Sequence, residues 1–123
     1  MAKHLLVVDD EAPTRELLGL FFRARGFAVT AASSGAEGRA LLRQGVYDLL
    51  ILDIELGDAN GLDLLPEIRS ACPAMPVIIF TGLQTTDVML QRAREAGAAG
   101  FLSKTQPLDS MLEIINQNLP QGR

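Results

Sequence analysis

The chain has 123 residues, of which 48% are hydrophobic and 21% charged, and it carries a formal net charge of -4. This is the size and composition of one folded domain, and the acidic balance argues against direct binding to nucleic acid. The one cysteine, Cys72, excludes an intrachain disulfide, and no apolar run approaches a signal-peptide core or the ~20 residues of a membrane span, so we expect a cytoplasmic protein.

The first elements alternate between strand and helix patterns. Residues 5–8 predict a short strand, after which Pro13 is well placed in the first turn of a helix that Gly26 ends. The apolar residues of this segment recur at the one-and-four spacing of a helix: Leu17, Leu18, Phe21 and Phe22. Residues 27–31 predict a second strand.

A second helix and a buried strand follow. Ser34, with Glu37 three residues later, is typical of a capping box at a helix start. Residues 48–53 are apolar on both faces, which indicates a parallel strand buried from both sides. The turn at Asn60-Gly61 then predicts a third helix, with an apolar stripe of Leu62, Leu65 and Ile68.

The last third of the chain holds two further strand–helix units. Residues 77–80 and 98–103 predict strands, and residues 86–96 predict the helix between them. The final helix has the clearest amphipathic stripe: Leu108, Met111, Leu112, Ile115 and Leu119. Five such units predict an α/β fold with a three-layer, doubly wound, five-stranded parallel sheet. We expect residues 1–123 to form one domain, with residues 120–123 as a tail or linker stub.

Polar residues suited to phosphoryl chemistry follow four of the predicted strands. Asp9-Asp10, Asp53, Thr81 and Lys104 each close an apolar run. In open α/β sheets, ligands bind in the crevice outside the carboxyl ends of the strands. If the four strands are neighbours, three carboxylates, a hydroxyl and an ammonium therefore converge at one edge.

Such a cluster suits a metal ion and a phosphoryl group. Carboxylates brought close together raise one another's pKa unless a cation intervenes, and Mg²⁺ prefers oxygen ligands. A carboxylate beside Mg²⁺ can act as a nucleophile toward phosphorus and form an aspartyl phosphate. The metal, the Lys104 ammonium and the Thr81 hydroxyl would then neutralise the phosphoryl oxygens.

In this order, the motifs resemble the receiver domain of bacterial two-component response regulators, the CheY-like fold. The resemblance runs from Leu5 to Leu119 and implies a flavodoxin-like (βα)5 fold. It also implies a signalling switch that promotes only its own phosphorylation and dephosphorylation, rather than an enzyme. The stretches that carry it are Val7-Val8-Asp9-Asp10-Glu11, Leu50-Ile51-Leu52-Asp53-Ile54, Asn60-Gly61, Thr81-Gly82 and Gly97-Ala98-Ala99-Gly100-Phe101-Leu102-Ser103-Lys104.

The resemblance implies a role for each site residue. Asp53 would be the phospho-acceptor, and Lys104 and Thr81 would contact the phosphoryl oxygens. Mg²⁺ or Mn²⁺ would be bound directly by Asp10, Asp53 and the backbone carbonyl of Glu55, and through water by Asp9.

The resemblance also implies a switch and its partners. Thr81 and Phe101 would be the switch pair, and the output face would lie on the fourth helix, fifth strand and fifth helix, with Met89, Gln91 and Arg92 exposed there. A histidine kinase or phosphotransfer protein, or a small phosphodonor, would supply the phosphoryl group. A downstream output domain or partner protein would read the face, which could also form a homodimer. No direct contact with nucleic acid or a membrane is expected.

Four residues depart from the family pattern. Phe101 stands where tyrosine is common, so the ring has no hydroxyl. Gly57 stands where proline is usual, which should loosen that loop. Thr105 replaces the usual proline after Lys104, and because a non-proline cis bond costs about 2.5–4 kcal/mol we expect a trans Lys104–Thr105 bond. Glu55 adds a negative charge at the rim of the site.

Two other functions share this topology. A nucleotide- or flavin-binding domain would need glycine and hydroxyl residues after the first strand, where this chain has Asp9-Asp10-Glu11. A pseudo-receiver would bind partners without being phosphorylated. The presence of every site residue favours the phospho-accepting switch, although each residue alone has an ordinary explanation, such as a helix cap for Thr81.

Overall fold

The computed structural model describes residues 2–82 and 86–119, which form one parallel sheet with strand order β2-β1-β3-β4-β5. The strands are β1 (His4–Val8), β2 (Ala28–Ala32), β3 (Leu49–Leu52), β4 (Val77–Thr81) and β5 (Gly100–Ser103). Five helices alternate with them: α1 (Ala12–Arg23), α2 (Gly35–Gln44), α3 (Gly61–Ala71), α4 (Asp87–Ala96) and α5 (Leu108–Asn118). The predicted element order and α/β fold class are confirmed.

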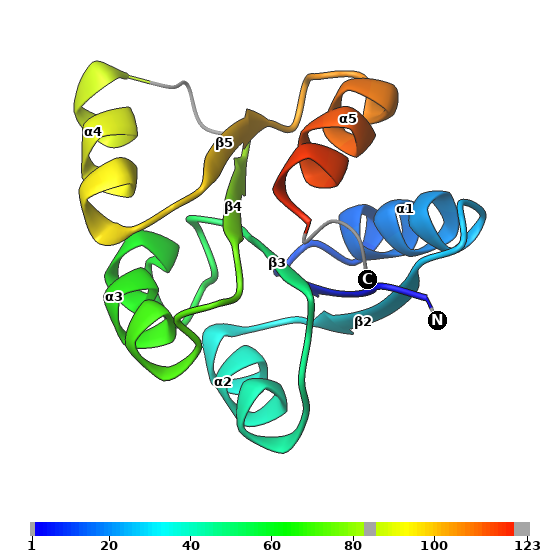
Figure 1. The fold of residues 1–123 in the computed structure, drawn as a ribbon. Coiled ribbons are helices and arrows are strands. Elements are labelled where there is room, and N and C mark those ends of the chain that lie inside the picture. The colour runs from blue at the N-terminus through cyan, green and yellow to red at the C-terminus, as the bar shows by residue number, and fades with distance from the viewer. Residues whose placement is uncertain (1, 83–85, 120–123) are drawn as a thin grey trace.

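The helices cover both faces of the sheet. Figure 1 shows α1 and α5 on one face and α2, α3 and α4 on the other. Alternate residues of β1 enter the two apolar layers, since Leu5 and Val7 pack with the α1 and α5 side chains while Leu6 and Val8 belong to the opposite layer. A sheet covered on both faces needs apolar residues at successive strand positions, which explains the unbroken apolar runs.

The register of the strands brings their carboxyl ends to one edge. Val8 is paired with Leu52 across β1 and β3, and the ladder continues one step further because the Asp53 N–H donates to the Val8 carbonyl at 3.0 Å. Likewise, the Lys104 N–H donates to the Thr81 carbonyl at 2.8 Å, past the end of β5. The candidate site residues are therefore placed by backbone pairing.

Helix caps account for several element boundaries. The Ser34 hydroxyl accepts from the Glu37 N–H at 3.1 Å, as the capping box predicts. The Glu37 carboxylate accepts from the Ser33 N–H instead of completing the box at Ser34 itself. Gly97 ends α4 with a φ of 103°, a left-handed conformation that favours glycine.

Some helical positions differ from the sequence-based expectation. Leu17 belongs to the apolar pattern of the first helix but is 52% exposed, whereas Leu18 and Phe22 are buried. The inward face of α1 is thus narrower than the apolar pattern suggests. Met89, expected to be exposed, is half-buried and packs against the core layer under α2, α3 and α4.

Two further expectations concern membrane spans and the end of the chain. In the described ranges 2–82 and 86–119, no helix has the length and apolar character needed to cross a membrane. The expected tail at residues 120–123 lies outside the described residues.

Candidate functional site

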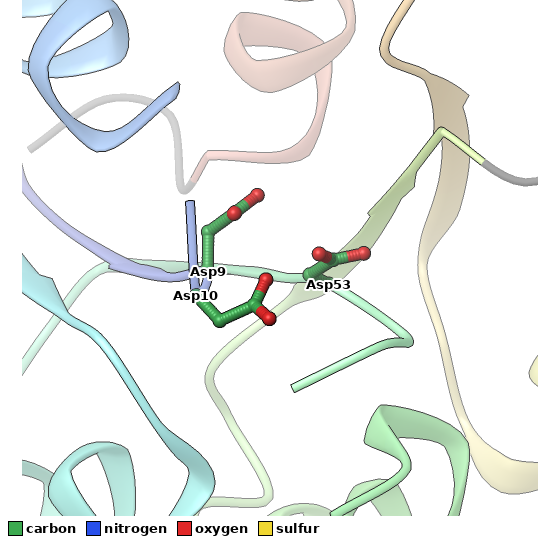
Figure 2. Close-up of side chains that lie close together, drawn as sticks. All are labelled: Asp9, Asp10 and Asp53. Carbon is green, nitrogen blue, oxygen red and sulfur yellow. The ribbon is translucent and has the colours of Figure 1, made fainter. Parts of the chain in front are cut away.

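Three carboxylates come together at the carboxyl edge of the central strands. Asp9 and Asp10 follow β1, and Asp53 follows the neighbouring strand β3. One carboxylate oxygen from each lies within 4.8 Å of the other two. Figure 2 shows the three side chains projecting from the two strand ends into the same region. The structure thus brings together the acids that the strand pattern placed at one edge.

The Lys104 ammonium sits among these acids. Its Nζ lies 2.8 Å from Oδ2 of Asp9, 3.2 Å from Oδ2 of Asp53 and 2.7 Å from Oε1 of Glu11. Asp9 and Asp53 are buried, whereas the Glu11 side chain is 60% exposed. Lys104 therefore compensates two buried charges and one at the rim.

Burial and neighbouring charges shift the pKa values of Asp53, Lys104 and Glu11. Burial is the main reason that the pKa of Asp53 is raised to about 6; the nearby Asp9 charge adds to the rise, and Lys104 partly opposes it. For Lys104, burial lowers the pKa, but the contacts with Asp9 and Glu11 outweigh it and raise the pKa above its ordinary value. The hydrogen bond to Lys104 lowers the pKa of Glu11. Asp53 is ionised at neutral pH, but at a free-energy cost.

The donor set fits a hard divalent cation. All three acids offer carboxylate oxygens, the ligands that Mg²⁺ prefers. Oδ1 of Asp9 accepts from the Glu11 N–H at 2.9 Å, while its buried Oδ2 accepts no hydrogen bond among the described residues and meets only the Lys104 charge. A buried carboxylate oxygen left in this state is suited to a cation or to a water held by one.

An open cleft gives access to the acids. It has a volume of about 480 Å³ and exposes the acidic edge to solvent. The Glu55 side chain is exposed at the cleft. The backbone N–H of Glu55 donates to Oδ1 of Asp53 at 3.4 Å. The residues that line the cleft are Asp10, Glu11, Asp53, Glu55, Gly57, Gly82 and Lys104.

Thr81 and Phe101 lie on neighbouring strands. Thr81 is buried at the end of β4, and Phe101 of β5 is half-buried against the apolar layer under α2, α3 and α4. Phe101 is paired with Ile79, and because side chains two apart in a strand share a face, Thr81 lies on the same side of the sheet as Ile79. The predicted switch pair therefore shares one face of the sheet, beneath α4.

The loop after β3, which contains Gly57, is joined by hydrogen bonds to the start of α2. The Asp58 carboxylate accepts from the Gly35 N–H at 2.9 Å and from the Ala36 N–H at 3.0 Å, at the start of α2. Within the loop, the Leu56 N–H donates to the Ala59 carbonyl at 3.1 Å. Gly57 has a φ of 71°, which the ring of proline forbids. The glycine thus serves a different loop conformation.

The backbone after the lysine agrees with expectation. There is no cis peptide bond in residues 2–82 and 86–119, so the Lys104–Thr105 bond is trans, as predicted. Neither Glu11 nor Asp58 has a role that the sequence pattern predicts. For Glu11 the one available signal was its place directly after two acids; Asp58 offered none beyond its loop position.

Comparison with known proteins identifies the family. The model described as the response regulator receiver domain matches residues 5–116 of this chain. The transcriptional regulatory protein GlrR of Escherichia coli (strain K12) is 36% identical over 119 residues, covering 97% of this chain and 27% of that protein. The chain therefore spans about a quarter of the length of that curated relative.

Solved structures agree. A CheY-like receiver domain protein from Methanospirillum hungatei JF-1 superposes with a TM-score of 0.90 at 26% identity, over 95% of this chain and 93% of that one. The response regulator TrrA from Thermotoga maritima, solved in complex with Mg²⁺-BeF, has a TM-score of 0.86 at 32% identity, over 95% and 99% of the chains. With its five-stranded doubly wound sheet and acidic edge, this chain belongs to the receiver domain family of two-component response regulators.

Proposed function

We propose that this receiver domain is a phospho-accepting switch whose acceptor is Asp53. The observation that carries the proposal is the buried Asp53 carboxylate beside the Lys104 ammonium, with Asp9 and Asp10 close by. A histidine kinase, a phosphotransfer protein or a small phosphodonor supplies the phosphoryl group. Signalling relatives such as GlrR, in which a receiver is part of a longer transcriptional regulator, support this role.

The acidic edge would hold Mg²⁺ or Mn²⁺. Asp10, Asp53 and the Glu55 backbone carbonyl are the proposed direct ligands, and Asp9 would act through water. Support comes from the oxygen-only donor set and from the buried Oδ2 of Asp9. When bound, the metal supplies positive charge that offsets the carboxylates and the phosphoryl oxygens.

The chain's own residues carry the transfer. A carboxylate oxygen of Asp53 forms a bond to phosphorus while the donor's P–N or P–O bond breaks, and the leaving imidazole or carboxylate keeps the electron pair. Lys104 and Thr81 stabilise the charge on the phosphoryl oxygens. Attack of water on phosphorus later releases phosphate and restores the carboxylate, so the domain acts only on its own phosphoryl group.

Phosphorylation would be read on the face formed by α4, β5 and α5. Thr81 and Phe101 are the proposed two-state element, since they lie on one side of neighbouring strands beneath α4. The modified state shifts the population only by as much as it favours one arrangement of this face over the other. Val88, which is 74% exposed on α4, is available to an output domain, a partner protein or a second copy.

Intact-mass measurement tests the proposal. The folded protein is incubated with Mg²⁺ and acetyl phosphate, then with phosphoramidate as a second donor. We expect one added phosphoryl group, which is absent from Asp53→Asn and absent after chelation of the metal. A folded protein that acquires no phosphoryl group from any donor would be a pseudo-receiver, and the proposal would be wrong.

A further inference from the structure

Glu11 belongs to the cleft but has no part in the proposed transfer. It directly precedes α1, yet its carboxylate does not cap that helix and instead lies 2.7 Å from Nζ of Lys104. This is the shortest of the three contacts that the ammonium makes with carboxylates. One of the three carboxylates that contact Lys104 is therefore an exposed acid outside the metal donor set.

We propose that Glu11 is a positioning residue that holds Lys104 at the rim and competes with an incoming phosphoryl group for its ammonium. The inference rests on the proposed function, because it assigns a restraint to the same site. Without the Glu11 carboxylate, the Lys104 ammonium binds the phosphoryl group more readily.

The number of contacts around Lys104 supports this competition. An ammonium has three N–H groups, and three carboxylate oxygens already lie within 3.2 Å of Nζ. A phosphoryl oxygen that approaches Nζ therefore competes with these carboxylates, of which Glu11 and Asp53 accept hydrogen bonds from the ammonium while Asp9 forms an ion pair with it. Asp9 and Asp53 are buried at strand ends. The longer Glu11 side chain is 60% exposed, so its carboxylate can move away from the ammonium into solvent.

The charges of the loaded site point the same way. A divalent cation on the acidic edge would share the negative charge of Asp9 and Asp53, which weakens their attraction for Lys104. Glu11 lies outside the three-acid group and keeps its full charge. The Glu11–Lys104 ion pair then remains as the main restraint on the lysine.

Glu55 provides a matched control for the charge of Glu11. Both side chains are exposed and both line the cleft, so either one repels an anionic donor. Among the described residues, Lys104 forms ion pairs with Asp9, Glu11 and Asp53 but not with Glu55. Loss of the Glu55 charge should therefore act without involving the lysine.

The test is a double-mutant cycle read by affinity for beryllofluoride with Mg²⁺, a mimic of the phosphoryl group, and by the rate of phosphorylation by acetyl phosphate. Glu11→Gln and Glu55→Gln are each made in the wild-type and in a Lys104→Met background. We expect Glu11→Gln to raise both quantities by about two- to five-fold, the scale of an exposed ion pair. This gain should vanish in Lys104→Met, whereas the effect of Glu55→Gln should be equal in both backgrounds.

Two results would overturn the proposal. One is a Glu11→Gln effect of the same size with and without Lys104, which would reduce Glu11 to a rim charge. The other is no gain at all in a variant whose amide spectrum shows a native fold. A wild-type protein that takes up neither beryllofluoride nor a phosphoryl group would instead refute the underlying function, before any variant is compared. Glu16→Gln, an exposed change on α1 outside the output face, checks that loss of one negative charge elsewhere has no effect.

Discussion

Gly61, the first residue of α3, lies directly against the backbone carbonyl oxygen of Asp53. A Cβ at this position would overlap that oxygen, and the Gly61 N–H donates to the Ile54 carbonyl at 2.7 Å. Only glycine permits so close an approach of two backbones. The start of α3 thus rests on the residue that we propose as the phospho-acceptor.

Gly61→Ala should therefore disturb both the fold and the site. We expect the free energy of unfolding in urea to fall by about 1–3 kcal/mol, because the added methyl group must displace backbone rather than a flexible side chain. Amide resonances of residues near Asp53 should shift. Gly45→Ala is the control, since the atoms nearest to a Cβ there belong to the Tyr47 side chain, at 3.6 Å or more, which is ordinary van der Waals contact. Equal losses in the two variants would contradict the steric explanation.

Asp53→Asn should stabilise the metal-free protein at neutral pH. Burial and the Asp9 charge raise the pKa of Asp53 to about 6, so its ionised form costs free energy in the folded state. Removal of the charge should add about 1–3 kcal/mol to the free energy of unfolding, measured with a chelator present. The gain is limited because Lys104 loses its ion pair with Asp53 in this variant.

Added Mg²⁺ should reverse this order. The wild type gains stability when it binds the cation, in proportion to the logarithm of free metal above the dissociation constant. Asp53→Asn lacks one proposed ligand and should gain less. If magnesium raised the melting temperature of both proteins equally, Asp53 would not contribute to the metal site.

The Asp58 carboxylate predicts a pH-dependent contribution to stability. Its hydrogen bonds from the Gly35 and Ala36 N–H groups lower its pKa, so it binds a proton less readily when folded than when unfolded. The contribution is therefore complete above the ordinary aspartate pKa and is lost as pH falls through the lowered value. Wild type should exceed Asp58→Asn in stability at pH 7, and the difference should shrink below about pH 4. A difference that does not change down to pH 2 would refute this.

Leu17 and Leu18 provide a direct comparison of exposed and buried positions on α1. Leu18 is 1% exposed, and Leu18→Ala should lower the free energy of unfolding by about 2–5 kcal/mol because it leaves a cavity. Leu17 is 52% exposed, and Leu17→Ala should stay within about 0.5 kcal/mol of wild type. Chemical denaturation of both variants checks the orientation of α1. Similar losses at the two positions would mean that Leu17 is also buried.

The sheet and its acidic edge could be predicted because they depend on short stretches of sequence. Each apolar run and the polar residue that ends it lie within a few positions, and the parallel topology then places the ends together. The Glu11–Lys104 and Asp58–Gly35 contacts join residues 93 and 23 positions apart. No local pattern encodes such contacts, since they depend on how loops from different units meet.

Helix faces were harder to predict than strands. Four apolar residues in α1 are compatible with more than one inward direction, and packing against β1 and β2 decides in favour of Leu18 and Phe22. Pro66 lies inside α3 although proline removes a helical hydrogen bond. The helix continues because Leu65 and Ile68 are buried against the sheet, so tertiary packing outweighs local preference.

The pairing of β1 with β3 also decides what can relieve the crowding of the acids. Asp53 is held by its N–H on the Val8 carbonyl, and Asp9 by its N–H on the Ala32 carbonyl. The main chain of both residues is thus anchored in the sheet, and a slip by one residue would turn either side chain to the opposite face. Backbone movement within the intact sheet therefore cannot separate the two residues, and only side-chain rotation can move their carboxylates apart. The register of the sheet thus keeps two acidic residues side by side, and a proton, the lysine or a cation can offset the repulsion between their carboxylates.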